Sequence, residues 1–120
     1  MNKRLLGFEF EEKAVEYLKE NNYTIIEQNY YSSYGEIDVI ALKDDCVCAV
    51  EVKYRNNPKV SIFESIPQSK INKIVKTLLF YIQQHIEYQK DYNLRVDALL
   101  IENNNGKITN TLVENIQANY

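Results

Sequence analysis

The sequence predicts an α/β domain in which a mixed five-stranded sheet is flanked by helices. Two segments, 5–21 and 67–90, repeat apolar residues at helical spacing. Five shorter segments are rich in apolar and β-branched residues and are separated by polar breaks. The second helix stands between the third and fourth strands. It is therefore expected to be a right-handed crossover that makes the strand at 94–101 parallel to a neighbour.

The first part of the chain is expected to form a helix, a strand and a hairpin. The helix at 5–21 has one apolar stripe, and Glu11 lies at the edge of that stripe. A strand at 23–29 follows, and then a hairpin of the segments 35–43 and 46–54 turns around Asp44 and Asp45. The stripe of the helix consists of Leu6, Phe10, Ala14, Tyr17 and Leu18.

The second part is expected to form a long helix and two strands. The helix runs from about Pro67 to Lys90, and Pro67 suits its first turn. A buried strand at 94–101 leads through the turn "NNNG" into an edge strand at 107–114. The last six residues either close the fold or fray. The apolar stripe of the long helix consists of Ile71, Ile74, Val75, Leu78, Ile82 and Ile86.

Length and composition indicate a single domain over residues 1–120, since 45% apolar and 26% charged residues are ordinary for a globular protein. The net charge of −3 means that any affinity for nucleic acid must come from a local basic patch. Cys46 and Cys48 are expected to be free thiols on one face of a strand, which favours a reducing compartment. The absence of a signal-like or membrane-length apolar run favours a cytoplasmic protein without membrane contact.

The predicted hairpin places charged residues at its centre. With a symmetric loop, Asp38 lies opposite Glu51 and Glu36 lies opposite Lys53, all four on the same face. Opposed side chains have Cβ atoms roughly 4.5–5.5 Å apart, so two carboxylates there need a shared proton, a nearby lysine or a divalent cation. A bulge of one residue would break this register.

A divalent cation fits this pair best, because carboxylate oxygens and waters are what Mg²⁺ prefers. Lys53, one step along the same face, could then orient a water or stabilise charge on a phosphate. Metal, carboxylates and lysine are the parts that phosphodiester hydrolysis needs. The simpler interpretation is a solvated sheet face that carries a Glu36–Lys53 ion pair.

The stretch "GEIDVIA…AVEVKYR" resembles the D…ExK core of the PD-(D/E)XK, or restriction-endonuclease-like, superfamily. More narrowly, nearly the whole chain resembles the YraN-like family of small bacterial proteins, which are classed with endonucleases and related in motif to Holliday-junction resolvases. The stretch "LGFEFEEKAVEYLKENNYTII" resembles the first helix and strand of this family, and "RVDALLI" its later buried strand. Phe10 departs from the glycine that the family often has, and the C-terminal residues match only loosely.

The resemblance implies a restriction-endonuclease-like fold and a metal-dependent endonuclease that hydrolyses DNA phosphodiester bonds, with branched or processed DNA as candidate substrates. The implied catalytic residues are Asp38, Glu51 and Lys53. The implied ligands of Mg²⁺ or Mn²⁺ are Asp38, Glu51, Glu11 and the backbone carbonyl of Val52.

Basic residues are candidate contacts to nucleic acid. Lys70 matches a lysine that opens the long helix, and Arg55 joins it in a candidate phosphate-facing strip, whereas Lys73 and Lys76 are more simply solvated. Glu36 either holds Lys53 in place or contacts a second metal. A homodimer is expected because many nucleases of this fold act in pairs. The alternatives are a non-catalytic nucleic-acid-binding module that retains the fold, and an interaction protein whose carboxylates are structural.

Overall fold

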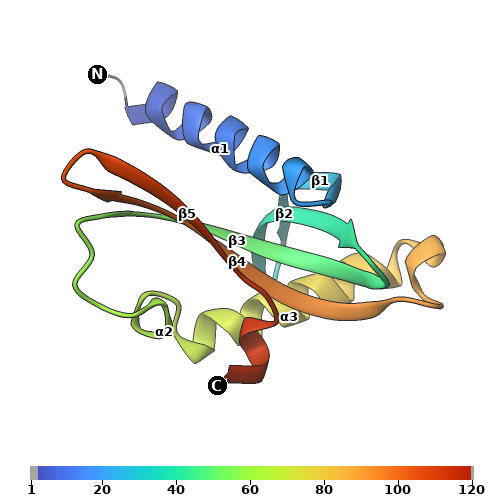
Figure 1. Cartoon of the computed structure of the whole chain (residues 1–120). Coiled ribbons are helices and arrows are strands. Elements are labelled where there is room, and N and C mark those ends of the chain that lie inside the picture. The colour runs from blue at the N-terminus through green and yellow to red at the C-terminus, as the bar shows by residue number, and fades with distance from the viewer. Residues whose placement is uncertain (1–2, 120) are drawn as a thin grey trace.

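The computed structural model describes the backbone of residues 3–119 and the side chains of residues 10–117. Five strands form one mixed sheet in the order β1-β2-β3-β4-β5 (Figure 1). Strands β1 to β3 form an antiparallel meander, β3 and β4 are parallel, and β4 and β5 are antiparallel. The elements are α1 (Lys3–Glu20), β1 (Thr24–Ser32), β2 (Gly35–Lys43), β3 (Cys46–Asn56), α2 (Ile62–Ser65), α3 (Gln68–Gln83), η1 (Ile86–Tyr88), β4 (Asn93–Asn104), β5 (Lys107–Val113) and η2 (Ile116–Asn119).

The predicted fold class is confirmed, because helices cover both faces of this sheet. Helix α1 lies over one face and packs Ala14 and Leu18 against β2, β3 and β4. Helix α3 lies across the other face and is the predicted crossover between the parallel strands β3 and β4 (Figure 1). The core on the α3 side is closed by Ile71, Ile74, Leu78 and Tyr81 of that helix.

The predicted register of the β2–β3 hairpin is confirmed from Lys43–Cys46 to Val39–Val50. Asp44 has a left-handed backbone, with φ of 54°, which an aspartate tolerates better than most residues because its short side chain can bond locally. Cys48 and Val50 pack in the core on the α1 side, as alternation requires, and both cysteines are free thiols. The hairpin therefore presents its predicted apolar face to α1.

Helix α3 ends at Gln83 rather than at Lys90. The ring of His85 stacks on Tyr81 at a centroid distance of 3.9 Å, and its Nδ1 lies 2.7 Å from the Tyr81 carbonyl oxygen. The chain leaves the helix at this point, and Ile86 is 81% exposed instead of continuing the apolar stripe. Tyr81 is the buried residue of this turn.

Two short elements complete the fold. Helix α2 lies between β3 and α3, and the Ser61 side chain caps it by accepting a hydrogen bond from the Glu64 N–H. At the C-terminus η2 closes the fold rather than fraying, because Ile116 is buried and the Gln117 side chain accepts a hydrogen bond from the Val96 N–H at 2.9 Å. Across the described residues, no helix is both long and apolar enough to span a membrane.

Candidate active site

The candidate site lies where the β2–β3 ladder stops. Its last described backbone pair is Val39–Val50, and the next position on β2 is Asp38. The Asp38 carboxylate Oδ2 accepts a hydrogen bond from the backbone N–H of Val52 at 2.9 Å. A hydrogen bond from the Val52 backbone to the Asp38 side chain thus replaces backbone pairing at this position, and Asp38 is held against β3 beside Glu51.

The alternation of β2 shifts at Asp38. Ile37 packs in the core on the α3 side, whereas Val39, two residues later, packs on the α1 side. On the neighbouring strand, Asn29 lies opposite this point and has a left-handed backbone with φ of 52°. The expectation that Asp38 shares one regular face with Glu36 and Glu51 is therefore wrong in this detail, because the local backbone at Asn29 and Asp38 interrupts the alternation.

Asp38 and Val52 line a cavity of about 200 Å³ between α1 and the sheet. Glu11 of α1 is exposed and lines the same cavity. The structure thus brings together Glu11, Asp38 and Val52, three of the four residues expected to surround a metal, whereas Glu51, the fourth, is not among the residues that line this cavity. The remaining lining residues are Phe10, Ala14, Val15, Gln28, Asn29, Val39, Tyr54 and Ile101.

Glu51 lies on the α3 side of β3 and is only 6% exposed. Its Oε1 is 2.7 Å from the Nζ of Lys70, whose side chain is 45% exposed. The hydrogen bond to Glu51 raises the pKa of Lys70, so this lysine is firmly cationic. Lys70, predicted as a nucleic-acid contact, thus pairs with a carboxylate of the candidate site.

The electrostatics at Asp38 reveal an uncompensated charge. Burial and the neighbouring Glu51 carboxylate raise the pKa of Asp38 to about 6, despite the Val52 N–H and the Lys70 ammonium, which lower it. The Val52 N–H and the single lysine therefore do not fully compensate the charges of Asp38 and Glu51. A divalent cation would neutralise this remaining negative charge.

Two further predicted residues lie near this pair. Lys53 is half-buried on β3 and, by alternation from Glu51, projects toward the α3 side. Glu36 is exposed and lines a shallow depression together with Lys70 and Lys73 of α3. Glu36 also contributes to the raised pKa of Asp38.

The donor set suits a hard cation that keeps part of its water shell. Within the described part of the chain, no three His, Cys, Asp or Glu side chains are grouped closely enough to hold a metal by themselves. Structural zinc normally takes four such ligands, whereas Mg²⁺ is usually bound through one or two carboxylates and several waters. Asp38 and Glu51, with the backbone of Val52 and Glu11 on the cavity wall, fit the second case.

Arg55 is occupied by structural contacts rather than presented to a ligand. Its Nη2 lies 2.7 Å from Glu102, its Nη1 donates to the Val60 carbonyl and the Ser65 hydroxyl, and its side chain is only 12% exposed. The guanidinium ties α2 and its preceding loop to β3 and β4. We therefore leave Arg55 out of the candidate nucleic-acid surface.

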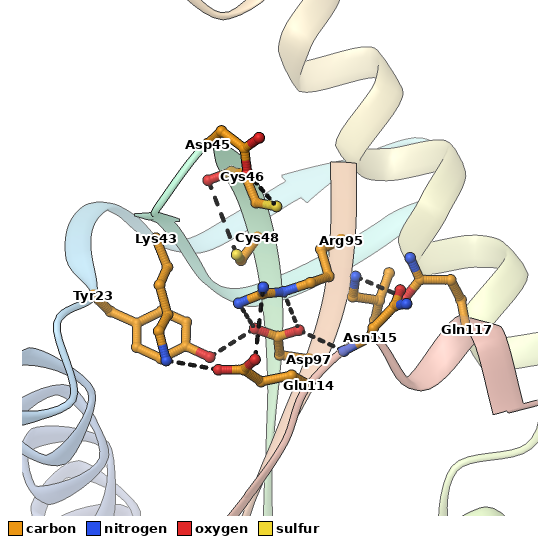
Figure 2. Close-up of polar contacts among 11 residues, drawn as sticks. Tyr23, Lys43, Asp45, Cys46, Cys48, Arg95, Asp97, Glu114, Asn115 and Gln117 are labelled. Atoms are coloured by element: carbon orange, nitrogen blue, oxygen red, sulfur yellow. Dashed lines mark hydrogen bonds and ion pairs between the residues drawn. The ribbon is translucent and has the colours of Figure 1, made fainter. Parts of the chain in front are cut away.

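A second polar cluster, which sequence reasoning missed, surrounds the fully buried Asp97 of β4 (Figure 2). Its carboxylate accepts hydrogen bonds from the Tyr23 hydroxyl at 2.7 Å, from Arg95 at 2.8 and 2.9 Å and from the Asn115 N–H at 2.9 Å. Arg95 also approaches Glu114, which pairs with Lys43.

This cluster is a structural one, because the Asp97 oxygens are saturated by four donors from three parts of the chain. Burial and the hydrogen bond to Asp97 raise the pKa of Tyr23, so its hydroxyl stays protonated and donating. The signal in the sequence was the charged pair Arg95 and Asp97 inside an otherwise apolar strand, because buried charges require partners.

Comparison with known proteins places the chain in one family. A family model described as "Uncharacterised protein family UPF0102" matches residues 10–101, a range that contains every candidate site residue. A UPF0102 protein of Fusobacterium nucleatum is 43% identical over 100 residues, which cover 82% of each chain. One from Sulfurihydrogenibium is 45% identical over 100 residues, 82% of this chain and 87% of its own. One from Helicobacter hepaticus is 39% identical over 116 residues, 97% of each chain.

Proposed function

The chain belongs to the UPF0102 family, and because that family description states no activity, we propose a function from the site itself. UPF0102 proteins are YraN-like, so the resemblance noted in the sequence is confirmed at the level of the family. We propose that the protein is an endonuclease that hydrolyses DNA phosphodiester bonds and depends on Mg²⁺ or Mn²⁺ held by Asp38 and Glu51.

The observation that carries this proposal is that Asp38 and Glu51 both lie next to Val39–Val50, the last backbone pair of the β2–β3 ladder, where their charges interact. Glu51 is buried, and the pKa of Asp38 is raised to about 6 by burial and by Glu51. A fold gains nothing in stability from two such carboxylates side by side. A divalent cation bound there during function would offset this repulsion.

The backbone carbonyl of Val52 and the carboxylate of Glu11 complete the proposed ligand set, since both residues line the cavity beside Asp38. A bound Mg²⁺ or Mn²⁺ would act as a Lewis acid toward the phosphate and make a water more acidic. The Lys53 ammonium, on the same side of β3 as Glu51, would orient the attacking water and stabilise negative charge that develops on the phosphate. We therefore assign Asp38, Glu51 and Lys53 as the catalytic residues.

DNA binding is proposed to be local and sensitive to salt. The net charge of −3 provides no general attraction to DNA, so the lysines beside the site must supply it. Lys70 and Lys73 lie at the rim of the depression next to Glu36.

One such domain covers little duplex, and we include a homodimer in the proposal, to be tested by light scattering with and without DNA. The free thiols of Cys46 and Cys48 fit a cytoplasmic location.

One observation favours a second candidate, a non-catalytic nucleic-acid-binding module. The ion pair between Lys70 and Glu51 already neutralises one carboxylate of the site. If this pair were permanent, the fold would retain its charged face without needing a metal.

The test is cleavage of end-labelled single-stranded, duplex, nicked and four-way branched DNA, and of RNA, in Mg²⁺, Mn²⁺ or EDTA. Asp38→Asn and Glu51→Gln are compared with Glu12→Gln, a control on the exposed part of α1. We expect cleavage that needs metal, that falls by about 10²-fold or more in the two site variants and that persists in the control. Binding without cleavage of any substrate would support the second candidate. Equal cleavage by Asp38→Asn and wild type would refute the proposed site.

A further inference from the structure

We infer that Lys70 is the resident counter-ion of the metal site. On this account a divalent cation that enters beside Asp38 and Glu51 displaces the Lys70 ammonium, which then becomes available to a DNA phosphate. The inference deepens the proposed function and rests on it. It starts from the 2.7 Å ion pair between Lys70 and Glu51, in which the lysine lies against a proposed metal ligand.

The two partners of this pair differ in their freedom to move. The Glu51 side chain is 7% exposed and fixed in the sheet between Val50 and Val52, whereas the Lys70 side chain is 45% exposed on a flexible four-carbon stem. When a second cation competes for the same carboxylate, the buried partner stays and the exposed partner leaves. A compact dication with several oxygen ligands is the stronger competitor for a paired carboxylate site.

The position of Lys70 in α3 also favours its release from Glu51. Lys70 is the third residue of the helix, in a first turn that contains no acidic residue. A cation at a helix N-terminus is disfavoured, because the exposed N–H groups already make that end positive. The helix therefore does not hold the ammonium in place, and within the described contacts Glu51 is its ion-pair partner.

Once released from Glu51, the Lys70 ammonium would lie at a shallow depression beside the site. The shallow depression beside the site is lined by Glu36 and Ser69 as well as by Lys70 and Lys73. In this depression the two ammonium groups outnumber the single carboxylate of Glu36, so the rim becomes net positive once Lys70 leaves Glu51. Positive charge next to the proposed metal ligands is where a DNA phosphate would lie during hydrolysis.

Replacing Lys70 should change the affinity for Mn²⁺ and the affinity for an oligonucleotide in opposite directions. Replacing Lys70 with methionine removes the competing cation but keeps a long unbranched side chain, so Mn²⁺ should bind more tightly. The same change should weaken binding of a short single-stranded oligonucleotide in Ca²⁺, but not in EDTA, where wild-type Lys70 is still engaged by Glu51. A residue that merely supports the fold would weaken both.

The experiment is calorimetric titration of Mn²⁺ at about pH 7.5 into wild type, Lys70→Met, Lys70→Arg and the control Lys76→Met, an exposed lysine farther along α3. We expect Lys70→Met to lower the Kd by about tenfold, the order of one charge-assisted hydrogen bond, Lys70→Arg to raise it, and the control to stay within about twofold. Fluorescence anisotropy gives the oligonucleotide affinities. Wild type that binds Mn²⁺ together with a Lys70→Met variant that binds equally or more weakly would overturn the inference alone. Wild type that binds no Mn²⁺ would overturn the proposed function as well.

Discussion

The carboxylate of Asp38 accepts the backbone N–H of Val52 at 2.9 Å, immediately beyond the last backbone pair of β2 and β3. This hydrogen bond links the two strands where their ladder ends. It also orients Asp38 toward the cavity under α1 while leaving it close enough to Glu51 for their charges to interact. The stability and the proposed chemistry of the site both depend on it.

The first prediction concerns the pH dependence of stability in EDTA. The pKa of Asp38 is about 6 in the folded protein against an ordinary value of 3.8, so the folded state holds this proton more tightly than the unfolded state. The stability that Asp38 contributes is therefore complete below about pH 4 and is lost as the pH rises through 6. Asp38→Asn keeps an oxygen for the Val52 N–H without the charge. It should be more stable than wild type by on the order of 2 kcal/mol near pH 7.5 and equally stable near pH 4.

Urea unfolding at both pH values measures this difference, and Glu12→Gln on the exposed surface provides the control. An Asp38→Asn variant that is no more stable than wild type near pH 7.5 would mean that the carboxylate pair is not under electrostatic stress.

The second prediction separates the chemistry from metal binding. Lys53→Met should reduce cleavage by about 10²-fold or more, because it removes the ammonium proposed to act on water and phosphate. Mn²⁺ affinity should be retained or improved, since Lys53 is not a proposed ligand and repels cations. Cleavage rates on the best substrate and calorimetry test the two parts. Full activity in Lys53→Met would rule out the assigned role.

The third prediction concerns the buried Asp97 cluster. Asp97→Asn leaves Arg95 without its bidentate carboxylate partner in a buried position, and breaking such a pair typically costs about 3–5 kcal/mol. Glu114→Gln, whose side chain is 44% exposed, should cost less than about 1 kcal/mol. Urea unfolding compares the two variants. Equal losses would show that the Asp97 cluster is not the main polar support of the sheet.

The fourth prediction reverses the expectation for Arg55. Arg55→Met should lower the free energy of unfolding by about 2–3 kcal/mol, because Glu102, the Val60 carbonyl and the Ser65 hydroxyl lose their donor. The affinity of the folded variant for oligonucleotides should change by less than about twofold. Weakening of DNA binding by tenfold at unchanged stability would instead make Arg55 a direct contact.

The fold and the hairpin register were predictable because they depend on local rules. The loop of Asp44 and Asp45 fixes which residues pair along β2 and β3, and the polar Asp38 and Glu51 interrupt apolar strands at matching positions. From these residues alone the sequence indicates a carboxylate pair at the centre of a sheet.

The rest depends on how distant segments meet. The shift of alternation at Asp38 accompanies a left-handed residue, Asn29, on the adjacent strand, and no pattern within β2 announces it. The pairing of Lys70 with Glu51 joins the first turn of α3 to β3, which are separated in the sequence by α2 and its flanking loops. The burial of Arg55 follows from α2, a four-residue helix that is too short to leave a periodic signal.

The central claim, that Asp38 and Glu51 hold a divalent cation, is tested most directly by titrating Mn²⁺ into metal-free wild type and Asp38→Asn by calorimetry. This measurement requires no knowledge of the DNA substrate. The account predicts saturable binding to wild type and its loss in Asp38→Asn, although that variant is expected to be folded and more stable. Absence of binding to wild type, or equal binding to both proteins, would contradict the account.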